Sequence, residues 1–429
     1  MRSSTTLSRR AGRCSLLSVL LLLSASAWAW GAEREGSVVD KQTGAPISGA
    51  TITSGDQVTF SDAEGKFHIE STGSSLLVRA AGYGRIEAGL EDGDSQVVSL
   101  EPLRTEGLYL TVYGIGAASL RDPALAVMKA AGLNTLVIDV KGDRGLIPYA
   151  SKVPLAAEIG ATKVRTVGDL AGLVAGLKAK GIYTIGRVVV FKDTLLAQAR
   201  PQWAIHNANG TLWHDREGLA WIDPFQTAAQ DYAISIAEEA AAAGFDEIQF
   251  DYIRFPDATG VVLAKASTQP DRVNAIIGFL GAARQRLQRY NVFISADIFG
   301  YVAWNTNDTF IGQKLEELAG VVDYLSPMLY PSGFQFGIPG HRNPVLSPYN
   351  IVYDTLTEAM RRTAASPVRY RPWLQGFPDY AFDRRKFGTA EISAQVKGAN
   401  RAGAIGWMLW NPRNVYTTDG LMPEESSRR

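Results

Sequence analysis

The fold is decided by a stretch that reads Ala241-Ala-Ala-Gly244-Phe-Asp-Glu-Ile-Gln-Phe-Asp251-Tyr-Ile-Arg-Phe255. An alanine-rich helical pattern stops at Gly244, and a strand-like run that carries an acid near its end follows. Glycine just past a helix supplies the left-handed residue that ends it. The same transition recurs at Lys129-Ala-Ala-Gly132-Leu, Lys178-Ala-Lys-Gly181-Ile and Arg401-Ala-Gly403-Ala. The chain therefore repeats a helix-then-strand unit.

Working outward from this unit gives eight strand candidates. They are residues 108–115, 135–141, 183–191, 247–255, 292–299, 324–330, 372–377 and 404–410. Helical patterns lie between them at 122–131, 166–180, 225–243, 271–289, 350–364 and 390–402, the first with Asp122-Pro123 as its expected start. Eight such units predict an α/β fold, a closed (β/α)8 TIM barrel. An open doubly wound sheet is the alternative, but no Gly-x-Gly-x-x-Gly turn follows the first strand.

Residues 36–102 have a different pattern, with short alternating runs separated by turn residues. Period-two alternation at this spacing predicts a small antiparallel β-sandwich, with 103–106 as the linker to the barrel. The segment contains Asp40-Lys-Gln-Thr-Gly-Ala-Pro-Ile-Ser-Gly-Ala50 and then Ser61-Asp-Ala-Glu-Gly65-Lys-Phe67. In these motifs it resembles the carboxypeptidase regulatory-like domain family. The resemblance implies an accessory or adhesive module, and we assign no catalysis to it.

Composition narrows the class of protein. The chain has 429 residues, of which 46% are hydrophobic and 20% charged, as in globular proteins. Its formal net charge is zero, and no basic cluster of the kind that binds nucleic acid is present. Disordered, fibrous and nucleic-acid-binding classes are therefore excluded.

The first 29 residues have the pattern of a secretory signal peptide. Four arginines precede an apolar run over 14–29, which is too short to favour a bilayer span. We expect a secreted or periplasmic protein with no stable membrane span after cleavage; an uncleaved anchor and twin-arginine export are alternatives. Removal of 1–29 leaves a net charge of −4. Residues 417–429 are expected to form a C-terminal tail.

The sequence gives little support for a metal site or for chemistry that uses a cysteine thiol. Cys14 is the only cysteine and leaves with the signal, so the exported chain can form no disulfide. Four histidines without a His-Glu-x-x-His helix do not suggest a zinc site. We predict no cofactor and no metal ligand, and leave open an ion near Asp139, Asp143 or Asp193.

Four consecutive strands carry aspartates at or just after their carboxyl ends: Asp139, Asp193, Asp251 and Asp297. Active sites of TIM barrels lie at this face. Alternation places Asp251 and Asp297 on the inward faces of adjacent strands, at similar heights.

Two carboxyl groups placed in this way can divide the work of glycosidic hydrolysis. We predict Asp251 as nucleophile or stabiliser and Asp297 as acid/base, with the reverse assignment open. The structural alternative is that Arg187 or Arg254 merely neutralises a strand-end aspartate.

Further side chains near these strand ends are substrate-binding candidates. They are Asp139, Lys141, Asp143, Asp193, Tyr252, Arg254, Met328, Tyr330, Trp373, Gln375 and Trp410. Three tryptophans, Trp203, Trp213 and Trp221, lie in the long insert 192–224, where we expect them to stack on sugar rings. Strand parity places Trp407 in the core and Trp410 at the floor of the site.

Four motifs together resemble a known family across residues 107–416. They are Gly107-Leu-Tyr-Leu-Thr111, Leu136-Val-Ile-Asp139-Val-Lys141-Gly-Asp143-Arg-Gly, Phe245-Asp-Glu-Ile-Gln-Phe250-Asp251-Tyr252-Ile-Arg254-Phe-Pro256 and Asp323-Tyr-Leu-Ser-Pro327-Met328-Leu-Tyr330-Pro331-Ser. The chain is similar here to bacterial glycoside-hydrolase-like TIM-barrel domains. The resemblance implies a barrel related to α-amylase-type and polygalactosaminidase-type hydrolases, with the fourth-strand Asp251 as nucleophile. The fifth-strand acid of α-amylases is usually Glu, whereas this chain has Asp297.

The sequence thus predicts an exported glycoside hydrolase whose partner is an extracellular or cell-envelope polysaccharide. The alternative is a catalytically silent envelope protein that binds glycan or peptidoglycan. A polysaccharide deacetylase is disfavoured because the chain lacks the paired histidines of such a metal site.

Overall fold

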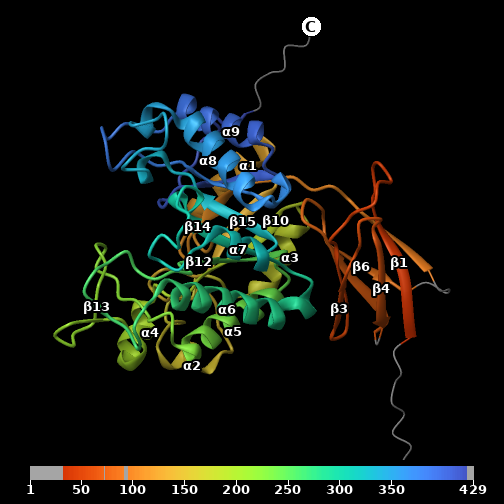
Figure 1. Ribbon diagram of the computed structural model, residues 1–429, viewed down its shortest axis with the longest axis horizontal. Coiled ribbons are helices and arrows are strands. Elements are labelled where there is room, and N and C mark those ends of the chain that lie inside the picture. The colour runs from red at the N-terminus through yellow and green to blue at the C-terminus, as the bar shows by residue number, and fades with distance from the viewer. Residues whose placement is uncertain (1–31, 72, 91–94, 423–429) are drawn as a thin grey trace, which may run out of the picture.

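The computed structural model describes residues 32–71, 73–90 and 95–422 (Figure 1). The predicted signal peptide, 1–29, lies outside the described residues, as does the tail beyond 422. The described part of the tail packs on the barrel, because Leu421 belongs to the main hydrophobic core. Within the described ranges, no helix has the length and apolar character needed to cross a membrane.

The barrel is closed and all its strands are parallel, as predicted. The strands are β8 (Thr105–Leu110), β9 (Thr135–Lys141), β10 (Tyr183–Val189), β12 (Glu247–Asp251), β14 (Phe293–Phe299), β15 (Tyr324–Met328), β16 (Trp373–Gln375) and β17 (Gly406–Trp410). They follow one another around the barrel in chain order, and β17 pairs with β8 to close it. The open-sheet alternative is excluded by this closure.

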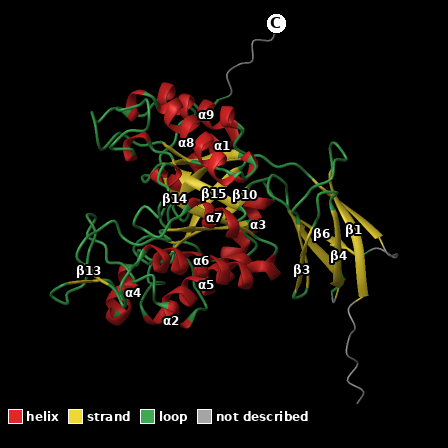
Figure 2. Ribbon diagram, viewed as in Figure 1, coloured by secondary structure: helices red, strands yellow, loops and turns green. Residues whose placement is uncertain are grey.

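Helices cover the outside of the barrel (Figure 2). They are α1 (Ala118–Ala131), α2 (Pro154–Glu158), α3 (Leu170–Lys178), α4 (Thr194–Ala199), α5 (Thr227–Ala242), α6 (Gln269–Leu287), α7 (Leu315–Val321), α8 (Pro348–Thr363) and α9 (Thr389–Ala402). The glycines predicted to end four of them all have positive φ: 70° at Gly132, 74° at Gly181, 100° at Gly244 and 85° at Gly403. The predicted start at Asp122-Pro123 is wrong, since α1 begins at Ala118 and includes Pro123.

The barrel interior is packed with side chains. Phe293, Tyr324, Trp373 and Met408 belong to one interior cluster, and a buried ion pair joins Arg371 to Glu247. Alternate residues of β12 and β14, among them Ile248 and Ile294, belong instead to the core shared with the helices. The predicted inward and outward faces of these strands are confirmed, so their last inward residues lie at one end of the barrel.

The N-terminal region is a two-sheet β-sandwich, beside the barrel in Figure 2. One sheet has the order β4-β1-β7 and the other β3-β2-β5-β6. The strands are β1 (Ala32–Asp40), β2 (Thr51–Ser54), β3 (Gln57–Phe60), β4 (Lys66–Ser71), β5 (Ser75–Arg79), β6 (Ile86–Gly89) and β7 (Ser95–Leu100). The prediction of a purely antiparallel sandwich is wrong in one respect, because β1 and β7 pair in parallel.

The sandwich is fastened to the barrel at the amino-terminal ends of the strands. Arg85 donates to the carboxylate of Asp246 and to the carbonyls of Gly244, Tyr290 and Asn291. The connection between β7 and β8 is residues 101–104, so the predicted linker 103–106 overlaps the start of β8. The strand-end aspartates therefore lie at the opposite end of the barrel from this interface.

Candidate active site

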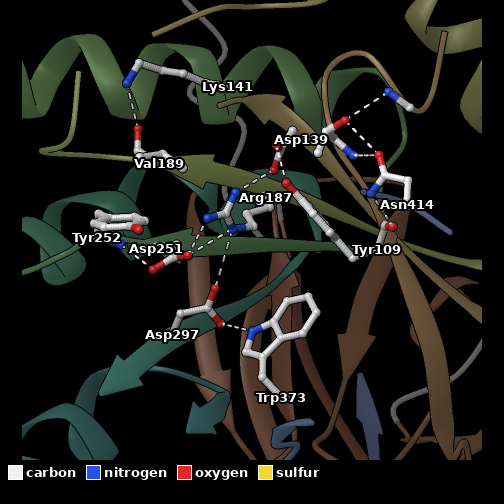
Figure 3. Close-up of polar contacts among 12 residues, drawn as sticks. Tyr109, Asp139, Lys141, Arg187, Val189, Asp251, Tyr252, Asp297, Trp373 and Asn414 are labelled. Atoms are coloured by element: carbon white, nitrogen blue, oxygen red, sulfur yellow. Dashed lines mark hydrogen bonds and ion pairs between the residues drawn. The ribbon is translucent and has the colours of Figure 1, made fainter. Parts of the chain in front are cut away.

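Three aspartates from three strands converge on the guanidinium of Arg187, at the carboxyl end of β10 (Figure 3). Arg187 Nη1 donates to Asp139 Oδ1 over 2.6 Å, and its Nη2 donates to Asp251 Oδ2 over 2.5 Å. Arg187 Nε lies 3.0 Å from that Asp251 oxygen and 3.9 Å from Asp297 Oδ2. The two carboxylates predicted to be catalytic therefore point toward a common centre.

Asp297 is placed as a neutral acid. Only 1% of it is exposed, and its Oδ1 accepts a hydrogen bond of 2.7 Å from the indole of Trp373. Its Oδ2 has no hydrogen-bond partner among the described residues. Burial and then the charge of Asp251 raise its pKa well above the ordinary value, because both disfavour the carboxylate. A buried carboxylic acid of this kind can donate a proton near neutral pH.

Asp251 is held differently, as a paired carboxylate. Its Oδ2 takes two hydrogen bonds from Arg187, and its Oδ1 accepts one of 2.5 Å from the backbone N–H of Tyr252. Only 5% of Asp251 is exposed. Asp251 thus accepts three hydrogen bonds, whereas the carboxyl group of Asp297 accepts one, from Trp373.

Asp139 is the aspartate that opens onto a cavity. Burial raises its pKa to about 6, although Arg187 and the hydroxyl of Tyr109 lower it. The Tyr109 hydroxyl donates to Asp139 Oδ2 over 2.7 Å. The ring of Tyr109 stacks on Trp410 at a centroid distance of 3.9 Å, so Trp410 lies beside the aspartates as predicted.

Two cavities adjoin the aspartates. The Asp139 cavity, of about 230 Å³, is lined in part by Tyr109, Asp139, Asp143, Arg144, Arg187, Tyr252 and Trp410. The tyrosine cavity, of about 310 Å³, is lined in part by Glu217, Tyr252, Arg254, Met328, Tyr330 and Tyr380. Tyr252 belongs to both, and its φ of 51° lies in the left-handed region, which is strained for a tyrosine. Its side chain therefore forms a wall between the two spaces.

The predicted acid pair itself lines neither cavity. Tyr330, in the wall of the tyrosine cavity, lies near both acids, since burial and then the charges of Asp297 and Asp251 raise its pKa well above the usual value. Contact between a substrate and these acids therefore requires the side chain of Tyr252 or Tyr330 to move.

Two substrate-binding candidates lie away from both cavities. Lys141 and Asp193 are fully buried and form an ion pair of 2.8 Å. The cause is a β-bulge, because Arg187 pairs with Asp139 while the next residue, Val188, pairs with Lys141. The bulge turns Lys141 toward the ring of Tyr232 on α5. Lys141 and Asp193 were predicted to bind substrate; the structure places them instead in a buried structural ion pair.

Gln375 and Trp373 are also buried. Gln375 accepts from the backbone N–H of Ser332 and donates to its hydroxyl, so it braces a loop. Trp373 donates a hydrogen bond to Asp297, and its ring packs edge-on against Tyr109 and Trp410. The other candidates, Asp143, Tyr252, Arg254, Met328 and Tyr330, line the cavities.

The expectation that the tryptophans of the 192–224 insert stack on sugars is wrong for Trp221. This side chain is 2% exposed, and its ring packs edge-on against Tyr252 at 5.4 Å. Trp203 and Trp213 are half-buried and pack against the same core. The insert therefore supports Tyr252. Trp407 is buried in the core, as predicted.

Several residues of the site were missed by sequence reasoning. Tyr109 lies inward on β8, and strand alternation alone could have found it. Glu217 and Tyr380 come from loops and Tyr301 from the short 3-10 helix Gly300–Ala303, where no periodicity indicates the direction of a side chain. Among the described residues, no group of three or more acidic, histidine or cysteine side chains is arranged to hold a metal ion.

Comparison with known proteins identifies one matching family. Residues 107–416 match the sequence profile of a family described as "Putative glycosyl hydrolase domain". No curated protein matches the chain. A hypothetical protein from Ruminiclostridium thermocellum ATCC 27405 is 35% identical, with a TM-score of 0.39, over 44% of this chain and 97% of that one.

A second solved structure shares the fold. It is the PgaB (BpsB) glycoside hydrolase domain from Bordetella bronchiseptica, 14% identical with a TM-score of 0.54. The match covers 76% of this chain and 100% of that one. At this identity the likeness concerns the barrel fold alone.

Proposed function

The chain belongs to this glycosyl hydrolase family, and on that premise we propose an exported enzyme that hydrolyses glycosidic bonds in an extracellular or cell-envelope polysaccharide. The observation that carries the proposal is the convergence of Asp251 and Asp297 on Arg187, where burial and the charge of Asp251 raise the pKa of Asp297. The sandwich would be an accessory module of the carboxypeptidase regulatory-like kind, and 1–29 the export signal.

In the proposed reaction, Asp297 protonates the oxygen of the leaving sugar. Its Oδ2, which has no hydrogen-bond partner among the described residues, is the atom free to carry that proton. Asp251 attacks the anomeric carbon or stabilises its positive charge. Arg187 balances the negative charge of Asp251 and also fixes Asp139, so the carboxylates keep their places as the proton moves.

A second candidate function is supported by the burial of the acid pair. Asp251 and Asp297 are 5% and 1% exposed, and Tyr252 and Tyr330 adjoin them in the cavity wall. A barrel in which these tyrosines never move would bind glycan in its outer cavities without cleaving it. This is the catalytically silent envelope protein of the sequence alternative.

The test is release of reducing ends from bacterial exopolysaccharides and wall glycans. Asp251→Asn and Asp297→Asn should each lower the rate by about 10²–10⁴-fold, the range for removal of an acid–base group. Asp56→Asn, in an exposed turn of the sandwich, is the matched control and should keep full activity.

Full activity in both site variants would overturn the catalytic assignment. Glycan binding that is equal in the wild type and both variants, without turnover, would establish the binding protein instead.

A further inference from the structure

We propose that the cleft continues beyond the tyrosine cavity into a distal sugar-binding subsite built around Phe336 and Tyr301, so that the substrate is a long chain cleaved internally. This inference rests on the proposed function and specifies its substrate class as an extended polymer. It is carried by a third cavity at the same end of the barrel.

The third cavity, here called the distal cavity, has a volume of about 420 Å³. It shares Arg254, Phe299 and Tyr301 with the tyrosine cavity, which in turn shares Tyr252 with the Asp139 cavity. The three spaces therefore form a row, and Tyr252 and Tyr330 line the middle one. A row of adjoining hollows suits a linear chain better than a single sugar.

Phe336, in the wall of the distal cavity, is 92% exposed. It is nevertheless fixed, because its backbone N–H donates to the Tyr301 hydroxyl over 2.9 Å. That hydroxyl donates in turn to the carbonyl of Gly337 over 3.1 Å. The two rings lie 6.4 Å apart at a tilt of 41°. Tyr301 thus holds the backbone that carries this exposed apolar ring.

Residues 305–311 form another part of the cavity wall, and Asp308 holds their backbone in place. Asp308 is 1% exposed and accepts from Arg272 Nε and Nη2 over 2.6 and 2.9 Å. The same carboxylate accepts from the backbone N–H groups of Phe310 and Gly312. These contacts hold Thr309 and Phe310 at φ of 54° and 58° and leave Phe310 72% exposed. Strain that is held by a buried ion pair indicates a surface shaped in advance for a ligand.

The chemistry of the distal cavity suits a sugar ring. The ring of Phe336 lines this cavity and can cover the apolar C–H face of a pyranose. Asn305, Asp257 and Arg254 line the same space and can hydrogen-bond to hydroxyl groups. One acidic and one basic side chain in this set favour an uncharged sugar unit over a strongly anionic one.

The experiment compares Phe336→Ala with Phe60→Ala in the full chain. Phe60 is a matched control, since it is 55% exposed but lies on the sandwich. Binding is measured by the retardation of each protein in native gels that contain glycol chitin or dextran. We expect at least one polymer to retard the wild type and Phe60→Ala equally. Phe336→Ala should bind about 5–10-fold more weakly, as expected for loss of one aromatic contact face.

The second measurement is the size of the products that the wild type releases from any glycan it cleaves. Internal cleavage gives oligosaccharides of mixed length at early times. The Phe336→Ala substitution should raise KM for long chains more than for short oligosaccharides, with kcat unchanged. Equal retardation of Phe336→Ala and the wild type, or no retardation of the wild type by either polymer, would overturn the distal subsite. Release of a single small product from the first time point would overturn internal cleavage.

The two proposals fail separately. Loss of binding in Phe336→Ala without any turnover by the wild type would refute the enzyme and keep the distal subsite. Turnover that depends on Asp251 but not on Phe336 would keep the enzyme and refute the subsite.

Discussion

Replacement of Asp139 by asparagine should change how the stability of the fold depends on pH. Burial raises the pKa of Asp139 from 3.8 to about 6, against the lowering effects of Arg187 and Tyr109. The folded chain therefore binds this proton more tightly than the unfolded chain. Wild-type stability from this group is greatest below about pH 4, falls as the pH rises toward 6, and is constant above it.

The magnitude follows from the size of the pKa difference. About two pKa units, at about 1.4 kcal/mol each, give about 3 kcal/mol between pH 4 and pH 7. Asparagine has no such proton. It also places an amide NH₂ among the donors Arg187 and Tyr109, which costs about 1–3 kcal/mol at every pH. This cost is the same at every pH. It therefore cancels when the difference in unfolding free energy between variant and wild type at one pH is subtracted from the difference at another pH.

The assay is urea unfolding of wild type and Asp139→Asn at pH 4, 5, 6 and 7. The free energy of unfolding of the variant, relative to the wild type, should rise by about 3 kcal/mol from pH 4 to pH 7.

Asp379→Asn is a control of opposite sign. Burial opposes ionisation of Asp379, but hydrogen bonds from the Ser332 hydroxyl and from the backbone of Ala381, Arg384 and Phe382 lower its pKa. Its asparagine variant should lose stability relative to the wild type only as the pH rises toward about 4, and the difference should be nearly constant from pH 4 to pH 7. A flat difference for Asp139→Asn over that range, or an equal rise for both variants, would refute the account of the buried carboxyl group.

Two further predictions concern stability. Arg85→Ala removes the contacts that fasten the sandwich to Asp246 and three barrel carbonyls, so we expect about 1–3 kcal/mol less stability and faster limited proteolysis between sandwich and barrel. Arg121→Ala, whose ion pair is with its neighbour Asp122, is the control and should leave the cleavage rate unchanged. Trp407→Ala removes a side chain that is 1% exposed from the barrel core and should cost about 3–5 kcal/mol in urea unfolding. A cost below about 1 kcal/mol would contradict the assignment of Trp407 to the core.

The repeating unit of the barrel could be predicted from sequence because its signals are local. Gly132 and Gly244 end helices through their own backbone conformation, and that preference is the same in any tertiary setting. Alternation along β14 likewise fixed which side of the strand carries Asp297, since successive side chains point to opposite faces. The closed fold and the meeting of the strand-end acids follow from such short-range rules.

The details of the site depended on contacts between residues far apart in the chain. One extra residue in β9, unmarked by any sequence pattern, turned Lys141 out of the barrel. Trp221 became a support for Tyr252 because the insert folds back onto the core. The length of Arg187 let one guanidinium reach Asp139 and Asp251 together. Strand periodicity gives the direction of a side chain, but burial, partners and pKa depend on what packs against it, and only the tertiary structure decides that.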